Sequence, residues 1–226
     1  MTKPRIAAFV PMRHTSERVK GKNYRPLGGR PLFHHIVEAL FACPQIDKVM
    51  IDTDSDYIAA DARGAFPDVG IVMRPEEIRG GDVPMNTVLE HDVSQVSADV
   101  YVQTHSTNPL LRAETISNAI DAFLTARDRY DSLFTVTPLQ TRLYTPDGHA
   151  INHDPAVLLR TQDLPPVMEE NSCLYVFTRD TLAKQGSRIG ERPLLYPLTA
   201  EEAWDIDEEI DWTVVEALYA SRGALP

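Results

Sequence analysis

The sequence predicts an α/β fold, in which a mainly parallel sheet is flanked by helices. Three observations lead to this prediction. A short, continuous apolar run near the start is typical of a strand that is buried on both faces. Further short apolar runs alternate with segments of helical periodicity, which favours parallel strands joined by helices. An apolar content of 43% over 226 residues is enough for one domain, which we expect to span residues 1–226.

The first strand, helix and strand lie within residues 6–52. Residues 6–10 read Ile-Ala-Ala-Phe-Val, which predicts a central strand. Residues 11–31 lack apolar periodicity but are rich in arginine, lysine and glycine, so they predict a long basic loop. Apolar residues return at helical spacing over 32–42, and residues 48–52 form a second predicted strand that ends in an acidic turn.

The same alternation continues to the end of the chain. Apolar residues recur at three- and four-residue spacing in the predicted helices 56–66, 87–96, 113–127 and 208–220. Short apolar runs predict the strands 70–73, 100–104, 132–137 and 172–177. Because helices separate most of these strands, we expect the strands to run mainly parallel, with helices on both faces.

The alternation is interrupted at about residues 138–170. Five prolines and glycines punctuate residues 141–167, where no long helical pattern occurs. We therefore predict an excursion from the core. An insertion of this kind in a small α/β domain often reaches toward a partner subunit, and the alternative is a surface loop without a partner.

Composition and charge exclude several classes of function. With 33 acidic and 22 basic side chains, the formal net charge is −11, which disfavours nucleic acids and anionic membranes as partners. The apolar run at the N-terminus is too short for a signal-peptide core or a membrane span. The two cysteines, Cys43 and Cys173, have no metal-ligand or disulfide-framework spacing. We therefore expect a protein of the reducing cytoplasm.

The basic loop after the first strand is the first candidate site. In open parallel sheets the ligand crevice lies at the carboxyl ends of the strands. Arg13, Arg18 and Lys22, together with glycine backbone N–H groups, could surround a polyphosphate at that place. The loop has neither the glycine fingerprint of a dinucleotide site nor the phosphate loop of an ATPase. A solvated basic loop without a ligand is the alternative interpretation.

The second candidate site is an acidic pair near the C-terminus. Residues two apart in an extended segment point to the same side, so Asp205 and Asp207 can converge on one hard cation. Magnesium beside a triphosphate is the natural candidate for that cation. Alternatively, Asp207 is the N-cap of the last helix. An acidic pair and a basic loop in one α/β sheet are what metal-assisted nucleotidyl transfer requires.

These residues belong to motifs that resemble the acylneuraminate cytidylyltransferases, the CMP-sialic acid synthetases. The resemblance covers nearly the whole chain. The first motif comprises Arg13, Ser16, Arg18, Lys22 and Asn23, followed by Arg25, Pro26, Leu27, Gly29, Pro31 and Leu32. The later matches, in chain order, begin at Asp52, Arg74, Asn108, Arg160, Glu170 and Asp205. Because these blocks follow one another in order, the resemblance is specific.

The resemblance implies a Rossmann-like nucleotidyltransferase fold whose excursion at about 138–170 is a dimerisation element. The implied state is a homodimer. The implied reaction is attack by the anomeric hydroxyl of a 2-keto sugar acid on the α-phosphorus of CTP, which yields a CMP-sugar and pyrophosphate. The implied cofactor is Mg²⁺, and the implied partners are CTP and the sugar acid.

The resemblance also assigns roles on the nucleotide side. Arg13 and Lys22 would hold and polarise the triphosphate, and Ser16 and Asn23 would shape the loop around the nucleotide. Asp205 and Asp207 match the magnesium ligands, and we also consider Asp207 for assisting deprotonation of the sugar hydroxyl. The residues expected around the cytosine are Arg74, Pro84 and Asn86, the latter two within residues 81–86.

The acceptor side departs from the family pattern. His105 stands where the family has a sugar-facing glutamine, and Gln103 takes that role if the strand is shifted by two residues. A protonated His105 could pair with the acceptor carboxylate, so we expect the acceptor KM to rise with pH through the imidazole pKa. The remaining residues assigned to the acceptor are Arg160, Gln162 and Tyr175.

Other functions remain as alternatives at this stage. The acceptor is expected to be a sialic-acid-like nonulosonic acid, and a 3-deoxy-octulosonate is the nearest rival. A glycosyltransferase that binds a finished nucleotide sugar, and a catalytically silent nucleotide-binding module, are further alternatives. The retained charges of Arg13, Lys22, Asp205 and Asp207 argue against a silent module, because unused buried charges are costly.

Overall fold

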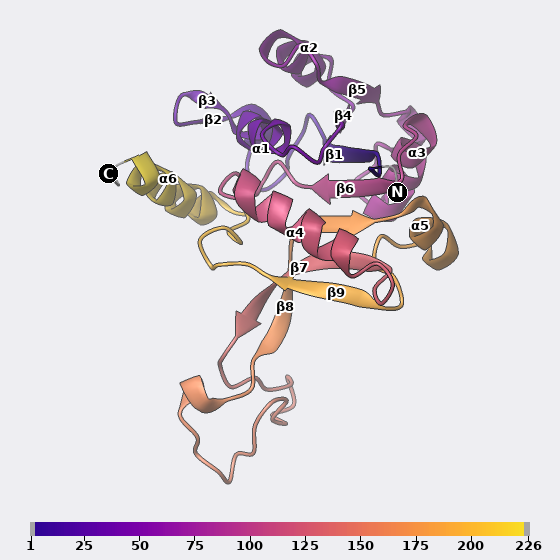
Figure 1. Cartoon of the computed structure of the whole chain (residues 1–226). Helices are drawn as coiled ribbons and strands as arrows, with labels where there is room; N and C mark the ends of the chain where they lie inside the picture. The colour runs from indigo at the N-terminus through magenta and orange to yellow at the C-terminus, as the bar shows by residue number, and fades with distance from the viewer. Residues whose placement is uncertain (1–2, 224–226) are drawn as a thin grey trace.

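The computed structural model describes residues 3–223 and has a seven-stranded sheet with the order β5-β4-β1-β6-β8-β7-β9 (Figure 1). Four strands confirm the predicted positions near the start: β1 (Ile6–Met12), β4 (Lys48–Thr53), β5 (Gly70–Met73) and β6 (Val100–Thr104). The remaining strands are β7 (Ser132–Leu139), β8 (Val167–Phe177) and β9 (Pro193–Pro197). Every neighbouring pair is parallel except those of β8, which runs antiparallel to β6 and β7. The predicted mainly parallel sheet is therefore confirmed.

Helices cover both faces of the sheet. Side chains at alternate positions of β1 point to opposite faces, and all seven of its residues are buried, which explains the unbroken apolar run. One face packs against α1 (Leu32–Phe41), α2 (Asp56–Ala65) and α4 (Ala113–Thr125). The other face packs against α3 (Met85–Gln95) and α5 (Arg179–Gln185).

A third apolar cluster joins the basic loop to the C-terminal helix α6 (Glu209–Gly223). Trp212 of α6 is 1% exposed, and it packs with Val19 and Leu27 of the loop. This cluster also contains Ile206, the residue between the two aspartates of the predicted acidic pair. Hydrophobic burial therefore holds the acidic segment against the basic loop, although nearly 190 residues separate them in sequence.

Several elements differ from the sequence-based expectation. The basic loop contains a short hairpin, β2 (Pro26–Leu27) and β3 (Arg30–Pro31), and a 3₁₀ turn, η1 (Lys22–Tyr24). Helix α5 and strand β9 were not predicted. Helix α5 has seven residues, too few to display a helical period, and β9 is a partly exposed strand at the edge of the sheet, with a proline at each end.

The strand order reverses beside β1. From β1 the chain builds toward β4 and β5 on one side and then places β6 on the other side. The loops that leave the carboxyl ends of the neighbouring strands β1 and β6 lie at this reversal, and open α/β sheets bind their ligands at such a point. Among the described helices, none combines the length and the apolar character that a membrane crossing requires.

The predicted excursion is present between β7 and β8. Residues 140–166 leave the sheet and project away from the body of the protein, and their only helical piece in the described structure is the 3₁₀ turn η3 (Thr161–Asp163) (Figure 1). Large apolar side chains are exposed along the excursion, at Tyr144, Ile151, Val157, Leu158 and Leu159.

Candidate active site

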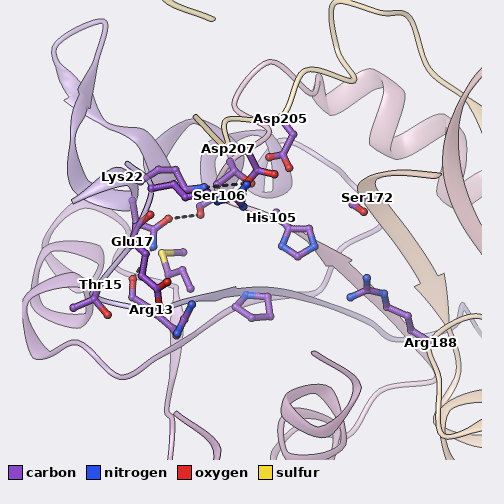
Figure 2. A pocket seen from close by; sticks show the side chains of 16 residues that line it. Arg13, Thr15, Glu17, Lys22, His105, Ser106, Ser172, Arg188, Asp205 and Asp207 are labelled. Atoms are coloured by element: carbon purple, nitrogen blue, oxygen red, sulfur yellow. Dashed lines mark hydrogen bonds and ion pairs between the residues drawn. The ribbon is translucent and has the colours of Figure 1, made fainter. Parts of the chain in front are cut away.

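A cleft of about 400 Å³, here called the main cleft, opens where β1 and β6 end (Figure 2). The loop after β1 supplies most of one wall, including Arg13, Ser16, Arg18, Lys22 and Asn23. The other lining residues come from the end of β6, from β8, from the loop before β9 and from the acidic segment: His105, Ser106, Thr107, Ser172, Arg188, Asp205 and Asp207. The basic loop and the acidic pair, predicted separately, therefore lie in one cleft.

The conformation of the basic loop depends on Gly21 and Asn23. Gly21 has φ +64°, and a Cβ there would lie 2.8 Å from the ring of Tyr24, so glycine is required at the start of η1. Asn23 is buried, and its Nδ2 donates to the carbonyl of Arg13 at 2.6 Å. Its Oδ1 accepts from Oγ of Ser106 at 2.6 Å, which ties the loop after β1 to the loop after β6.

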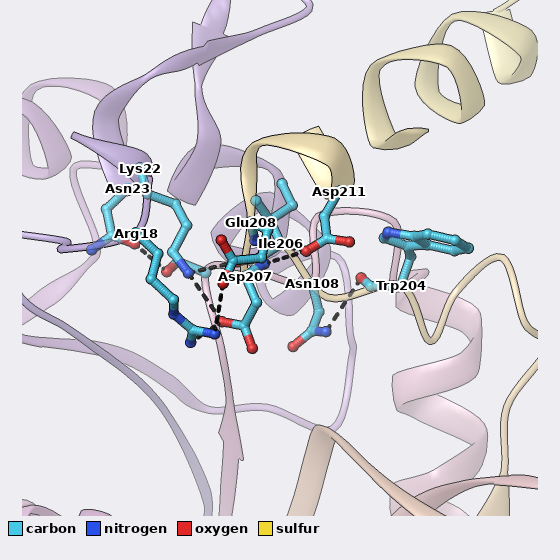
Figure 3. Close-up of polar contacts among 10 residues, drawn as sticks. Arg18, Lys22, Asn23, Asn108, Trp204, Ile206, Asp207, Glu208 and Asp211 are labelled. Carbon is cyan, nitrogen blue, oxygen red and sulfur yellow. Dashed lines mark hydrogen bonds and ion pairs between the residues drawn. The ribbon is translucent and has the colours of Figure 1, made fainter. Parts of the chain in front are cut away.

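Cations of the basic loop meet the acidic segment directly (Figure 3). Lys22 donates through Nζ to the carbonyl of Ile206 at 2.5 Å, and Nζ also lies 3.5 Å from Oδ1 of Asp207. Arg18 donates to the same Oδ1 at 2.7 Å and pairs with Glu208 at 3.4 Å. Two cations and a carboxylate are thus held in place before any ligand arrives.

The structure corrects the alternative in which Asp207 caps the last helix. The carboxylate that accepts from the N-terminal backbone is that of Asp211, whose Oδ2 receives the N–H groups of Asp207 at 2.9 Å and Glu208 at 2.7 Å. The side chain of Asp207 turns the other way, toward Arg18 and Lys22 (Figure 3). Its carboxylate is therefore available to the cleft.

Asp205 and Asp207 fit a divalent cation by their chemistry. Burial raises the pKa of the Asp205 carboxyl, a hydrogen bond from Thr107 lowers it, and the charge of Asp207 raises it further. Oδ1 of Asp205 is buried without a hydrogen-bond partner, which a hard cation would relieve. Within residues 3–223 no group of three or more His, Cys, Asp or Glu residues is arranged to hold a metal, so the triphosphate or water would complete the coordination.

A smaller hollow of about 170 Å³, here called the side hollow, adjoins the main cleft at Met12 and Arg13, which line both. Arg74 lines the side hollow, and its other lining residues come mainly from residues 80–88. Arg74 is 4% exposed, and its Nε donates to Oδ1 of the fully buried Asp52 at 2.6 Å. The segment predicted to bind cytosine thus forms a compartment beside the basic loop.

A second buried carboxyl group, that of Asp92, lies beside the ion pair of Arg74 and Asp52. Asp92 of α3 is fully buried beside Asp52, and among the described residues neither of its carboxyl oxygens has a hydrogen-bond partner. Burial and the neighbouring charge of Asp52 raise the pKa of Asp92 far above its ordinary value. Burial also raises the pKa of Asp52, while Arg74 opposes that effect. The two carboxyl groups therefore share one proton, and Arg74 balances the remaining negative charge.

The other residues predicted around the base have different positions. Pro84 is the N-cap residue of α3 and does not line the side hollow, although its neighbours Val83 and Met85 do. Asn86 does not line the hollow either. Its Oδ1 accepts the backbone N–H of Arg188 at 3.3 Å, so it positions the loop before β9.

The far end of the main cleft is built by three polar side chains in contact. Nη1 of Arg188 donates to Oε1 of Gln103 at 2.7 Å, and Nε2 of Gln103 lies 3.1 Å from Nε2 of His105. Because Arg188 fixes the orientation of the amide, Gln103 must donate to His105, and the remaining proton of the neutral imidazole is then on Nδ1. His105 and Arg188 therefore line this end of the cleft, and the buried Gln103 contacts both of them.

His105 differs from our expectation in its charge. Burial, together with the nearby cations Arg188 and Lys22, lowers the pKa of His105 to about 3. The imidazole is therefore neutral at physiological pH in the ligand-free protein, which argues against the predicted ion pair between a protonated His105 and an acceptor carboxylate. A neutral imidazole can still donate or accept a hydrogen bond.

Several predicted acceptor residues do not reach the cleft directly. Gln103 and Tyr175 are 0% exposed, so each acts through its neighbours rather than by touching a sugar. Arg160 lies on the excursion, exposed and paired with Asp163, and Gln162 is exposed beside it. The structure does not bring Arg160 or Gln162 into the main cleft of the same chain.

Arg188 and Ser172 are among the lining residues that sequence reasoning missed. Arg188 lies in the connection between the two unpredicted elements α5 and β9, so its surroundings were not foreseen. Ser172 has φ +58°, an uncommon conformation for a residue other than glycine, and no sequence pattern signals it. Its Oγ accepts from the hydroxyl of Tyr175 at 3.2 Å.

The sequence matches one family model and several known proteins. Residues 7–211 match the family described as cytidylyltransferase. The chain is 27% identical over 221 residues to the N-acylneuraminate cytidylyltransferase of Oncorhynchus mykiss, covering 95% of this chain and 50% of that protein. It is 27% identical over 230 residues to the CMP-N,N'-diacetyllegionaminic acid synthase of Legionella pneumophila, covering 95% of this chain and 96% of that protein. The chain thus spans about half of the first relative and nearly all of the second.

A solved structure has the same fold. CMP:2-keto-3-deoxy-manno-octonic acid synthetase complexed with CTP superposes with a TM-score of 0.71 and 14% sequence identity. The superposition covers 96% of this chain and 99% of that one. At this identity the likeness shows the Rossmann-like nucleotidyltransferase fold, as the sequence predicted.

Proposed function

This chain belongs to the cytidylyltransferase family, and from that premise we propose that it transfers CMP from CTP to the anomeric hydroxyl of a sialic-acid-like 2-keto sugar acid. One observation carries the proposal. Arg13, Arg18 and Lys22 converge with Asp205 and Asp207 in the cleft where the strand order reverses. Such a set of fixed charges suits a triphosphate and its metal. The relatives from Oncorhynchus mykiss and Legionella pneumophila are named for N-acylneuraminate and for N,N'-diacetyllegionaminic acid, which supports a sialic-acid-like acceptor.

We assign each step of the transfer to particular residues of the chain. The acceptor hydroxyl oxygen forms a bond to the α-phosphorus, the bond from that phosphorus to the bridging oxygen breaks, and pyrophosphate leaves with the electron pair. Arg13 and Lys22 stabilise the negative charge that grows on the phosphate oxygens. Asn23 and Ser106 hold the loop that carries these cations, so little reorganisation accompanies the reaction. The hydroxyl proton is lost during the attack, and Asp207 is the candidate to assist its departure.

Magnesium is part of the proposal. Asp205 and Asp207 would hold the ion, which is supported by the unpartnered buried Oδ1 of Asp205. When bound, Mg²⁺ supplies charge neutralisation and Lewis acidity at the triphosphate. Arg18 would remain beside Asp207 and limit how far that carboxylate can move.

One alternative acceptor, a 3-deoxy-octulosonate, is supported by a specific observation. The structure with a TM-score of 0.71 is a synthetase for 2-keto-3-deoxy-manno-octonic acid, which is a smaller 2-keto acid than a nonulosonic acid. Because the chemistry at phosphorus is the same, only the acceptor end of the cleft distinguishes the two. A glycosyltransferase, in contrast, gains no support from the family to which the chain belongs.

We further propose that the protein is a cytoplasmic homodimer. The exposed apolar side chains of the excursion support self-association, since five such side chains on one projecting segment suit a partner surface. Arg160 and Gln162 lie on the same segment. In a dimer this segment would bring them toward the acceptor site of the second copy. Both cysteines are free and buried, which fits a reducing compartment.

A substrate panel tests the reaction. The protein is supplied with Mg²⁺, one of CTP, ATP, GTP or UTP, and one of a set of eight- and nine-carbon 2-keto sugar acids, and pyrophosphate release is measured. We expect release with CTP and at least one nine-carbon acid, together with formation of the CMP-sugar. Release that needs no acceptor, or that occurs with a purine nucleotide and not with CTP, would contradict the proposal.

A further inference from the structure

Arg188 is a cation of the main cleft that lacks a counter-ion. Its side chain is half-buried, and within residues 3–223 no carboxylate forms an ion pair with it. Arg18 and Lys22 differ in this respect, because each is paired with Asp207. A half-buried guanidinium without an anion in a cleft is available to pair with a negatively charged group of a ligand.

The guanidinium has two contacts that position it, yet most of its donors are unused. Its Cζ lies over the ring of Tyr175, 3.6 Å from the ring centroid, and Nη1 donates to the fully buried Gln103. In the described structure this is the side chain's one hydrogen bond to the protein, whereas an arginine carries five N–H donors. The remaining donors form the planar fork that binds a carboxylate through two parallel hydrogen bonds.

The position of Arg188 separates it from the triphosphate-binding charges. Figure 2 shows Lys22 and Asp207 on one side of His105 and Arg188 on the other. The acceptor must approach the α-phosphorus from the side opposite to the leaving pyrophosphate, because attack and departure are in line. The end of the cleft at His105, Ser172 and Arg188 is therefore the end that an acceptor would occupy.

We propose that Arg188 binds the carboxylate of the 2-keto sugar acid and selects acidic acceptors. The inference rests on the proposed function and adds a residue that sequence reasoning had not considered. Gln103 and Tyr175 are then positioning residues, since both are fully buried. Gln103 accepts a hydrogen bond from the guanidinium, and the ring of Tyr175 packs against it. Neutral His105 takes the adjoining place, where its Nδ1–H can donate to an oxygen of the same acceptor.

Steady-state kinetics with an acid and its methyl ester test the role of Arg188. The wild type should use N-acetylneuraminic acid, or the best acid of the panel, in preference to the C1 methyl ester. Arg188→Ala should raise the KM for the acid by roughly 10- to 100-fold, the range of a lost charge-assisted hydrogen bond, and leave the KM for the ester and for CTP within about twofold. Arg188→Lys should recover part of the loss, because it keeps the charge but not the fork.

A matched control comes from the same loop. Arg192 is exposed and lies outside the main cleft, so Arg192→Ala removes the same charge four positions away and should leave all three KM values unchanged. An acid-to-ester preference that is equal in the wild type and in Arg188→Ala would overturn the inference. A raised KM for CTP in Arg188→Ala, with an unchanged KM for the acid, would also overturn it, because Arg188 would then bind a phosphate.

Calorimetric binding separates this inference from the proposed function. The same acids and esters are titrated into the full chain in the presence of CMP, which cannot release pyrophosphate. If the panel yields no pyrophosphate but acids bind more tightly than esters only when Arg188 is present, the proposed function fails and the inference stands. If pyrophosphate is released but the variant binds acids as the wild type does, the function stands and the inference fails.

Discussion

Nζ of Lys22 lies 3.5 Å from Oδ1 of Asp207, and this pair joins the basic loop to the acidic segment. The Lys22 side chain is only 12% exposed, whereas that of Asp207 is 47% exposed. The ammonium charge is therefore weakly screened by water, and it is oriented by the carbonyl of Ile206 as well as by Asp207. Preorganised charge of this kind is what stabilises a developing phosphate charge without reorganisation.

The first prediction concerns Asp207. Asp207→Asn should lower kcat by roughly 100- to 1,000-fold, because it removes a charge from the candidate magnesium site and keeps the shape of the side chain. The fold should be unaffected, since Asp207 does not cap α6. Pyrophosphate release at saturating substrates and the thermal unfolding midpoint are the two measurements, and wild-type release in the variant would remove Asp207 from the reaction.

Asp211 provides the matched control for this variant. Its Oδ2 accepts two backbone N–H groups at the start of α6. Asp211→Ala should therefore lower the free energy of unfolding by about 1 kcal/mol, as the loss of a capping residue does, with a smaller effect on kcat than Asp207→Asn. Urea unfolding of both variants would show whether catalysis and capping are separate.

The second prediction concerns the cations of the basic loop. Arg13→Ala and Lys22→Ala should each reduce kcat strongly while CTP remains preferred over UTP, because we propose that these side chains act on phosphate oxygens and that the base binds in the separate side hollow. Rates with both nucleotides would be measured for each variant. A variant with the wild-type kcat that accepts UTP would show that the residue reads the base instead.

The strand positions show how much of the fold the sequence could predict. The bounds of β5 and β6 are observed where they were expected. Short apolar runs flanked by polar residues leave little freedom in where a strand begins and ends. β8 begins five residues before the prediction, since its first half lies on the partly exposed base of the excursion and carries polar residues. β9 escaped prediction because partial exposure at an edge does not require an apolar run.

The site was predictable where a motif lies on one segment. Arg13, Lys22 and Asp205 line the cleft as expected, since each follows a recognisable pattern. Arg188 and Ser172 could not be found in this way. Their importance arises from tertiary neighbours, an amide and a ring beneath Arg188 and a left-handed backbone at Ser172, that leave no local pattern in the sequence.

The third prediction concerns the excursion. Leu158 is 88% exposed, the highest value among the large apolar side chains of the described residues. If the excursion mediates self-association, Leu158→Glu should shift the protein from dimer to monomer in light scattering coupled to gel filtration, because a buried unpaired charge is costly. Ile210→Glu, at a 68% exposed position outside the excursion, is the control and should leave the mass unchanged. A wild type that is monomeric at micromolar concentration would refute the homodimer.

The fourth prediction concerns the proton shared by Asp52 and Asp92. The pKa of Asp92 is raised in the folded state by burial and by the charge of Asp52, so its contribution to stability is full below the unfolded value of 3.8 and declines as pH rises. The free energy of unfolding should therefore fall between pH 5 and pH 8, by up to about 1.4 kcal/mol per pH unit from this group. Asp92→Asn should remove that slope, because an amide donates to Asp52 without a proton from solution. Equal slopes in both proteins, measured by urea unfolding, would show that Asp92 is not protonated.

The last prediction concerns His105, whose pKa is lowered by burial to about 3 in the folded state against 6.5 in the unfolded chain. Between these values the unfolded chain binds a proton that the folded protein does not, so this residue lowers stability progressively as pH falls below 6.5. His105→Gln should thus be less sensitive to acid than the wild type. In catalysis the imidazole stays neutral, so the wild-type acceptor KM should show no imidazole titration between pH 6 and pH 8. His105→Gln should change the acceptor KM by a similar factor at both pH values and leave the KM for CTP unchanged. An acceptor KM that rises through pH 6.5 in the wild type, and not in the variant, would show instead that the imidazole is protonated when the acceptor binds.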